Sequence, residues 1–452
     1  MRFKRSIYFI PLGISILLLT TFGGLNTPSP STFVSQPGSL LNDQPFYLGM
    51  LEDSNLLGGN TEEFRAMIGD LQSRGLDTVM FSNNDSQQDE PLLNISDELN
   101  FNVFMIPTAD LNINWWPSEV PANLETALTV ADPIVNRWKS HPSLKGYLTK
   151  DEPGIDELEK VSLIGEAFRM LDPSRPVMPI LIGVNRVAPI FNASQPEVML
   201  IDVYPFGAQN DLCDLAMTGF GYPDLDFVDY VSTVTKDKPA SVPLWIILQT
   251  HNFLDQLREP IATEVREEQW LAIGEGAKSI FWFTYSSQQG WRGLRDNPEL
   301  YAEVTSLTQR ILPLRDTLLG LQKTDDLFTI SGTGNYEPYA STLSSADNRH
   351  FVVAVNKDCQ SDQQLTIQAP GLEGQLRDLE TDTIYNLDSP ISFLPGDGKI
   401  FELIPGGEET PTDQHPMGVP TPHVHSPHRL TPFMRTYLQA YLEWLRQMIA
   451  KR

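Results

Sequence analysis

Between residues 46 and 320 the chain alternates short apolar runs with longer stretches whose apolar side chains recur at helical spacing. The apolar runs are Phe46–Leu51, Thr78–Ser82, Phe101–Pro107, Gly146–Lys150, Val177–Ile182, Val198–Tyr204, Pro243–Gln249 and Ser279–Tyr285. The amphipathic stretches include Thr61–Arg74, Asn123–Lys139, Ile155–Leu171 and Glu264–Ala277. This alternation predicts a parallel sheet with helices packed outside it. Eight strands in roughly 275 residues match the size of a (β/α)8 barrel, or TIM barrel, which we place at residues 43–322.

An open, doubly wound sheet is the main alternative for such a pattern. It usually carries a glycine-rich turn after its first strand, whereas the first run here is followed by Glu52 and Asp53. Two stretches around Gly276 and Gly332 lack the spacing of a phosphate or dinucleotide loop, so we interpret them as structural turns. We therefore favour the closed barrel.

Beyond Thr324 the helical periodicity stops. Short β-like runs separated by turn residues follow it: Phe328–Ser331, Phe351–Asn356, Gln364–Gln368, Leu376–Asp378, Thr383–Tyr385 and Ile400–Ile404. Runs of this length and spacing predict a small antiparallel β-sandwich over residues 323–405. We expect it to pack against the barrel.

The N-terminal segment has the composition of an export signal. Arg2, Lys4 and Arg5 precede the apolar run Ile7–Leu19, without an Ala-x-Ala cleavage site after it. We predict a signal peptide or an uncleaved membrane anchor over residues 1–27 and a linker over residues 28–42. Either reading places the protein outside the cytoplasm, secreted or anchored in the cell envelope.

The C-terminal segment differs from the rest of the chain. Residues 406–428 are rich in Pro and His and predict a second linker. Residues 429–452 combine apolar side chains at helical spacing with five basic residues, which predicts a basic amphipathic helix. We expect this helix to dock onto protein or onto a membrane, as the N-terminal segment also could.

Composition excludes some classes of partner. The chain has 32 Lys and Arg against 58 Asp and Glu, a formal net charge of -26, which repels nucleic-acid phosphates. Its two cysteines, Cys213 and Cys359, fall in different predicted domains. We therefore expect neither a disulfide framework nor a cysteine-type zinc site, and we expect Cys213 to be a buried, inert thiol in a helical stretch.

Polar and aromatic residues stand at the ends of the predicted strands, where a TIM barrel carries its chemistry. They are Glu52 on the first strand, Asn83 after the second, Trp115 and Trp116 after the third, Asp151 and Glu152 on the fourth, Asp202 and Tyr204 on the sixth, Gln249 on the seventh, and Trp282 and Tyr285 on the eighth. Carboxylates mixed with aromatic rings suit a sugar-binding cleft, because the rings cover pyranose C–H faces and the acids accept hydroxyl groups. A carbohydrate substrate is the expected partner.

The adjacent acids Asp151 and Glu152 are the most specific feature of this set. Two carboxyl groups in one partly desolvated cleft cannot both ionise easily, so one keeps its proton toward neutral pH. A general acid that protonates a departing glycosidic oxygen needs such a group. The same Asp-Glu-Pro sequence is also common at helix N-termini, where acids and Pro153 are favoured, so both readings stay open here.

The motifs resemble those of glycoside-hydrolase-like TIM barrels. The resemblance rests on four stretches in order: Gly146-Tyr-Leu with Asp151-Glu152-Pro153, Asp202-Val-Tyr204-Pro205, Trp245 to Gln249, and Glu267 to Trp282. It implies an extracellular carbohydrate-active protein whose acid/base residue is Glu152, at the end of strand four.

The sequence departs from the better-known retaining pattern in two places. Asp151 stands where that pattern has Asn, and Gln249 stands where it has a nucleophilic Glu at the end of strand seven. An amide cannot attack an anomeric carbon as a carboxylate does, so the usual double displacement is in doubt.

Three alternatives stay open. Asp151 could orient a 2-acetamido group of the substrate, which then supplies its own nucleophile, as in some hexosaminidases with adjacent Asp-Glu pairs. Asp202 or Glu52 could be the base of an inverting reaction if the carboxyl groups lie roughly 6.5–9.5 Å apart. The protein could also bind glycans without cleaving them, as a receptor or an envelope scaffold. We favour hydrolysis of a β-linked glycan, with no metal or organic cofactor.

Overall fold

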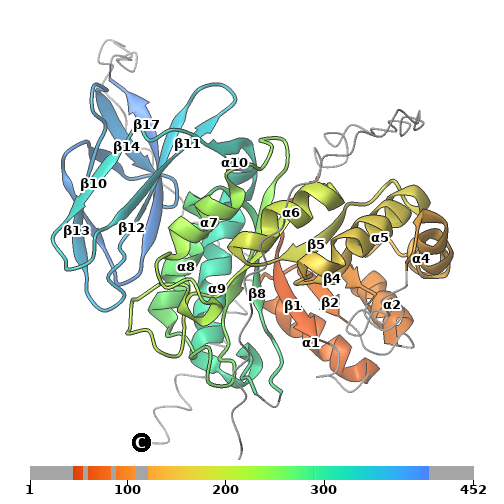
Figure 1. Ribbon diagram of the computed structural model, residues 1–452. Helices are drawn as coiled ribbons and strands as arrows, with labels where there is room; N and C mark the ends of the chain where they lie inside the picture. Colours follow the sequence, from red (N-terminus) through yellow and green to blue (C-terminus); the bar gives the residue numbers. More distant parts are fainter. Residues whose placement is uncertain (1–43, 54–59, 83–87, 108–120, 289, 407–452) are drawn as a thin grey trace, which may run out of the picture. The chain divides into compact units, whose positions relative to one another are not determined.

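The computed structural model describes residues 44–53, 60–82, 88–107, 121–288 and 290–406. In this part of the chain, eight parallel strands close into a barrel in chain order (Figure 1). They are β1 (Leu48–Asp53), β2 (Thr78–Ser82), β3 (Asn102–Ile106), β4 (Leu144–Asp151), β5 (Val177–Leu181), β6 (Met199–Val203), β7 (Leu244–Gln249) and β8 (Ala277–Phe283). Each predicted run overlaps one of these strands, so the barrel prediction is confirmed.

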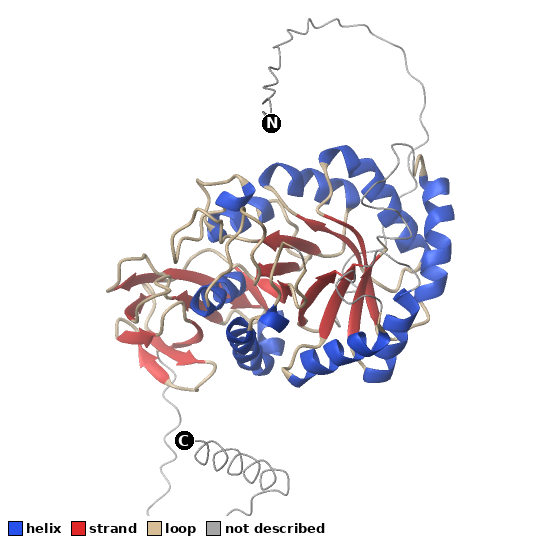
Figure 2. Ribbon diagram, turned by 90° about the horizontal axis from the view of Figure 1, so that it is seen from below, coloured by secondary structure: helices blue, strands red, loops and turns tan. Residues whose placement is uncertain are grey.

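Helices surround the strands, as Figure 2 shows. They are α1 (Thr61–Ser73), α2 (Asp89–Leu99), α4 (Leu124–Trp138), α5 (Leu158–Leu171), α6 (Val184–Ser194), α7 (Phe227–Thr235), α8 (Ala262–Gly274), α9 (Pro298–Ile311) and α10 (Arg315–Gly320). Side-chain caps fix several starts: Asn60, Asn123 and Asp226 each accept a hydrogen bond from a backbone N–H in the first turn. Helix α1 buries its apolar stripe against the sheet, with the rings of Phe64 and Phe81 5.3 Å apart.

Aromatic side chains fill the lower part of the barrel interior. Tyr47, Phe104 and Trp245, from three different places in the sequence, lie in mutual edge contact with ring centroids 5.3–5.4 Å apart. Gly146 of β4 makes room for them, since a Cβ there would lie 2.8 Å from the Phe104 ring. This part of the interior is thus a packed core.

The C-terminal region is a two-sheet β-sandwich, as the sequence predicts. One sheet has the order β10-β13-β16 and the other the order β15-β14-β17-β12-β11-β9. The strands are β9 (Leu321–Lys323), β10 (Thr329–Gly332), β11 (Tyr339–Ser345), β12 (His350–Val355), β13 (Gln363–Gln368), β14 (Gly374–Asp378), β15 (Ile384–Asn386), β16 (Pro390–Phe393) and β17 (Gly398–Pro405). A second core, which includes Val352, Leu365 and Phe401, lies between the sheets. The sequence analysis does not predict strands β9, β11 and β16, because they are short or rich in Ser and Thr.

Helix α8 lies between the barrel and the sandwich and is buried on every side. Gly398 of β17 packs on Trp270, and Ser341 of β11 donates a hydrogen bond to the carbonyl of Gly274 at 2.8 Å. Glu264 and Glu267 of this helix are fully buried. The sequence predicts an ordinary amphipathic helix here because its acids look like a solvent face.

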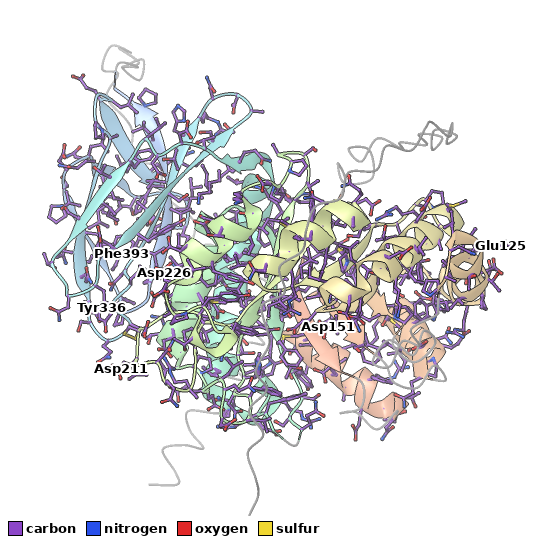
Figure 3. All side chains as sticks on the ribbon, in the orientation of Figure 1. Glu125, Asp151, Asp211, Asp226, Tyr336 and Phe393 are labelled. Atoms are coloured by element: carbon purple, nitrogen blue, oxygen red, sulfur yellow. A yellow bond between two sulfur atoms is a disulfide. The ribbon has the colours of Figure 1, made fainter. Side chains whose placement is uncertain are left out.

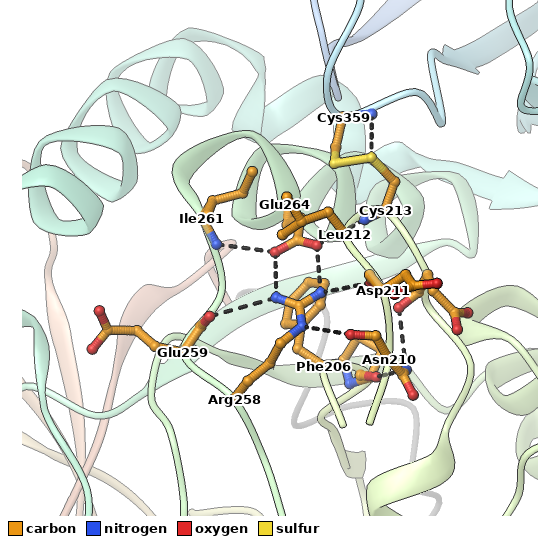
Figure 4. A network of polar contacts seen from close by, with 12 residues as sticks. Phe206, Asn210, Asp211, Leu212, Cys213, Arg258, Glu259, Ile261, Glu264 and Cys359 are labelled. Carbon is orange, nitrogen blue, oxygen red and sulfur yellow. Dashed lines mark hydrogen bonds and ion pairs between the residues drawn. A yellow bond between two sulfur atoms is a disulfide. The ribbon is translucent and has the colours of Figure 1, made fainter. Parts of the chain in front are cut away.

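The expectation that the two cysteines stay apart is wrong. Cys213 and Cys359 form a disulfide with Cα atoms 5.3 Å apart, which ties the loop after β6 to the sandwich (Figure 4). Cys213 also lies in a turn rather than a helix, and its N–H donates to Glu264 at 2.9 Å. Distance in sequence is a poor guide here, because the sandwich folds back over the loop.

The predicted segments 1–27, 28–42 and 429–452, and the Pro/His-rich linker after Gly406, lie outside the described residues. Among the residues that are described, no helix combines the length and apolar character needed to span a membrane.

Candidate active site

Strand β4 ends in an irregular segment that carries both acids of the doublet. The register between β4 and β5 shifts between Leu148 and Asp151. Glu152 has a positive φ of 42° and donates its N–H to the carbonyl of Ile180 at 3.0 Å. Left-handed backbone is costly for a residue with a side chain, and such outliers gather at functional sites. Here the two acids end a strand, so a helix-capping role does not account for the left-handed backbone of Glu152.

Glu152 is hydrogen-bonded to Asp202 of β6, and Asp202 to Tyr204. Asp202 and Tyr204 are only 2% and 5% exposed. Burial raises the pKa of Glu152, although the hydrogen bond from Asp202 and the charge of Arg186 on α6 oppose the rise. Burial also raises the pKa of Asp202 well above its ordinary value, and the charges of Asp151 and Glu152 raise it further. The two carboxyl groups therefore hold a proton to higher pH than ordinary carboxyl groups do.

Asp151 is exposed beside this pair. It pairs in register with Ile180 of β5, which places its side chain on the barrel-interior side of the sheet. Figure 3 labels Asp151 on the barrel, away from Tyr336 and Phe393 of the sandwich. The structure thus brings together Asp151, Glu152, Asp202 and Tyr204, four residues of the predicted site.

The aromatic residue that β8 presents to this site is Phe283. Its ring centroid lies 6.3 Å from that of Tyr204 and 4.7 Å from that of His251, and the rings of Tyr204 and His251 are 5.1 Å apart. Burial lowers the pKa of His251 to about 4, and its Nδ1 lies 2.9 Å from the carbonyl of Phe283. His251 is therefore neutral at physiological pH and can donate only from Nδ1 to that carbonyl.

Two aromatic residues predicted to contact sugar lie elsewhere. Trp282 precedes Phe283 on the strand and so points to the opposite side, toward the helices, where it is fully buried. Tyr285 is 5% exposed and packs against Tyr301 of α9 at 6.0 Å. Aromatic residues stand at both alternating positions of this part of β8, so the sequence does not show which ring lies on which side of the strand.

Glu52 and Gln249 are both fully buried and hold loops in place. One Glu52 oxygen accepts from the Thr284 hydroxyl at 2.8 Å and from two backbone N–H groups after β8. Burial raises the pKa of Glu52 to about 7. The Gln249 amide donates to the carbonyls of His251 and Arg258, both at 3.0 Å, and its oxygen accepts from the N–H of Phe206. In these contacts, both side chains therefore bond to loop groups rather than to the acid pair.

The predicted residues Asn83, Trp115 and Trp116 lie outside the described residues. Two residues near the acid pair escaped sequence analysis, Arg186 and Phe283. The structure identifies Phe283 by its register, because Phe283 aligns with Gln249 of β7 whereas Trp282 aligns with Leu248. No sequence signal marks Arg186.

No protein-family model matches this chain, and no curated protein sequence matches it. Solved structures do resemble its fold. A protein described as a glycoside hydrolase matches with a TM-score of 0.56 and 10% identity, over 80% of this chain and 93% of the other. A catalytic mutant of a GH42 β-galactosidase from G. stearothermophilus matches with a TM-score of 0.55 and 8% identity, over 79% and 98% of the two chains. A family 5 glycoside hydrolase from Bacteroides vulgatus matches with a TM-score of 0.51 and 11% identity, over 79% and 89%.

At these identities the likeness establishes the fold alone. The chain has a glycoside-hydrolase-like TIM barrel followed by a β-sandwich.

Proposed function

We propose that this protein is a glycoside hydrolase that cleaves a β-linked glycan with Glu152 as its general acid. The observation that carries the proposal is the contact of Glu152 with the buried Asp202, at a place where desolvation raises the pKa of Glu152. A carboxyl group that keeps its proton toward neutral pH can give it to the glycosidic oxygen while the bond from that oxygen to the anomeric carbon breaks. The fold of the solved glycoside hydrolases supports the same conclusion by analogy.

The geometry weighs against an inverting route. That route needs carboxyl groups roughly 6.5–9.5 Å apart, with a water between them. Glu152 and Asp202 are instead in direct hydrogen-bond contact, and Glu52 is fully buried under the loop after β8. Neither acid suits the role of base that the sequence left open for it.

A substrate-assisted route fits the site better. In it, the carbonyl oxygen of the substrate's 2-acetamido group attacks the anomeric carbon as Glu152 protonates the leaving oxygen. Asp151, exposed beside the pair, accepts a hydrogen bond from the acetamido N–H and orients the group. Water then attacks the anomeric carbon, the bond from that carbon to the acetamido oxygen breaks, and Glu152, now a carboxylate, accepts a proton from the water. The proposed substrate is therefore a β-linked glycan that contains a 2-acetamido sugar.

We also propose that the protein works outside the cytoplasm. The Cys213–Cys359 disulfide supports this location, because such bonds persist in oxidising compartments. The basic and apolar N-terminal segment agrees with it.

Release of reducing sugar from a panel of neutral β-linked glycans tests the activity. We expect wild type to release sugar and Glu152→Gln to lose at least a hundredfold in rate, since general acid catalysis contributes about 10²–10⁴. Glu166→Gln is the matched control, because Glu166 is exposed on α5. An unchanged rate in Glu152→Gln rejects the assignment.

Glycan binding without turnover is the second candidate. Gln249 favours it, because this amide replaces the carboxylate of the retaining pattern and is bonded to backbone groups. Binding that survives long incubation without any release of sugar supports this alternative, and cleavage that depends on Glu152 removes it.

A further inference from the structure

The loops that follow β7 and β8 are joined into one rim beside the acid pair. Leu254 donates its N–H to the carbonyl of Gly290 at 3.0 Å, and Arg292 donates its N–H to the side chain of Asn252 at 2.8 Å. At their base, Thr250 donates its N–H to the carbonyl of Phe283 at 3.0 Å. These contacts fix the spacing of side chains on the two loops, so the rim can present a preformed surface.

Aromatic rings continue from the site out onto this rim. Tyr204 contacts Phe283, the ring centroid of Phe283 lies 5.6 Å from that of Trp291, and the centroid of Trp291 lies 5.7 Å from that of Phe253. Tyr204 is buried, whereas Phe283, Trp291 and Phe253 are each partly exposed. The row thus leads from the acid pair toward solvent.

An exposed apolar residue lies next to the outer end of the row. Leu254 is 63% exposed, and a Cβ on Gly290 would contact its side chain at 3.2 Å. Its φ is 48°, a left-handed conformation that leucine rarely adopts. A strained backbone that holds an apolar side chain in water does not favour folding, and it suggests a binding surface.

We propose that Trp291 and Phe253 form a second sugar-binding platform on this rim, so that the substrate is a neutral glycan chain rather than a single terminal sugar. The inference rests on the proposed function, because the platform matters as an extension of the site around Glu152. Aromatic faces bind the C–H faces of pyranose rings in a chain that extends from the cleft.

Charge selects against polyanionic glycans. The chain carries a formal net charge of -26, and Asp255 on the rim is exposed. Glu259 on the same loop is paired with Arg292 at 3.2 Å, so this arginine is partly neutralised. Uronate or sulfated chains are therefore repelled, and uncharged chains are not.

Oligosaccharide binding to the Glu152→Gln protein tests the platform without consuming the ligand. The probes are short and long neutral β-linked oligosaccharides of N-acetylglucosamine, galactose and mannose. We expect Trp291→Ala, added to Glu152→Gln, to weaken binding of long chains roughly tenfold and to leave disaccharide binding unchanged. Trp291→Phe should restore most of the loss, and Tyr336→Ala, at a partly exposed ring on the sandwich, should change nothing.

Equal effects of Trp291→Ala on short and long chains, or no effect across the panel, would overturn the platform. Thermal unfolding of each variant checks that it is folded. Sugar release by the wild-type protein tests the proposed hydrolysis separately from the platform. Hydrolysis without dependence on Trp291 rejects only the platform, whereas Trp291-dependent binding without hydrolysis rejects only the catalytic assignment.

Discussion

Glu152, which directly follows β4, is hydrogen-bonded to the buried Asp202 of β6. The two strands are separated in the barrel by β5, so the contact spans one intervening strand. The proposed chemistry depends on the proton that this pair keeps.

The pair sets the expected pH dependence of hydrolysis. Burial raises both pKa values, so the proton needed for catalysis is present below the raised values and is lost as pH rises through them. Asp202→Ala removes the hydrogen bond that lowers the pKa of Glu152, so the alkaline limb of the pH–rate profile should move to higher pH. A profile with an unmoved alkaline limb in this variant would contradict the coupling.

The disulfide should stabilise the protein strongly. It closes a loop between residues separated by 146 positions, for which the chain-entropy model gives about 5 kcal/mol and measured cases are typically about 2–4 kcal/mol. We expect reduction, or the Cys213→Ser/Cys359→Ser double variant, to lower the free energy of unfolding in urea by such an amount. Reductant should have no effect on the double variant, and equal midpoints for oxidised and reduced protein would disprove the prediction.

Glu267 of α8 should make the protein less stable at alkaline pH. It is fully buried, and neither carboxyl oxygen has a hydrogen-bond partner among the described residues. Burial is the main cause that raises the pKa of Glu267 well above 4.5. The contribution of Glu267 to the free energy of unfolding is therefore greatest below pH 4.5, where this group is protonated in both the folded and the unfolded chain. The contribution falls as pH rises through the raised pKa, because the unfolded chain loses this proton first. Glu267→Gln should flatten the dependence of unfolding free energy on pH by up to about 1.4 kcal/mol per pH unit.

Urea unfolding at several pH values measures this slope. The exposed Glu166→Gln variant is the matched control, and its slope should equal that of wild type. The same slope in Glu267→Gln as in wild type would show that Glu267 does not titrate differently in the folded protein.

Replacing each of two glycines by alanine should change the stability of the protein in opposite directions. A Cβ at Gly146 would lie 2.8 Å from the Phe104 ring and 2.9 Å from the Pro176 carbonyl, so Gly146→Ala should destabilise by about 1–3 kcal/mol. Gly69, exposed on α1, has nothing within 4 Å of its Cβ position, so Gly69→Ala should stabilise by up to about 1 kcal/mol. Shifts of the same sign in thermal unfolding would contradict the packing of the barrel interior.

The strand pattern predicted the barrel because continuous apolar runs and helical spacing are local properties of the chain. It also placed Glu152, Asp202 and Tyr204 at strand ends, on the side of the barrel where this fold carries its chemistry. The orientation of Trp282 could not be predicted, since apolar neighbours on both sides hide which face of β8 is inward. The contact of Cys213 with Cys359, and the loop-holding contacts of Glu52 and Gln249, depend on how distant segments fold together.

The dependence of rate on the leaving group tests the central role of Glu152 most directly. With aryl and alkyl β-glycosides of N-acetylglucosamine, Glu152→Gln should hydrolyse the alkyl glycoside at least a hundredfold more slowly than wild type does. It should keep most of the wild-type kcat/KM on a dinitrophenyl glycoside, which reports the step that expels the leaving group, because that leaving group departs as a stable anion without a proton. An equal loss of rate on both substrates, or no loss on either, would contradict the assignment of Glu152 as the general acid.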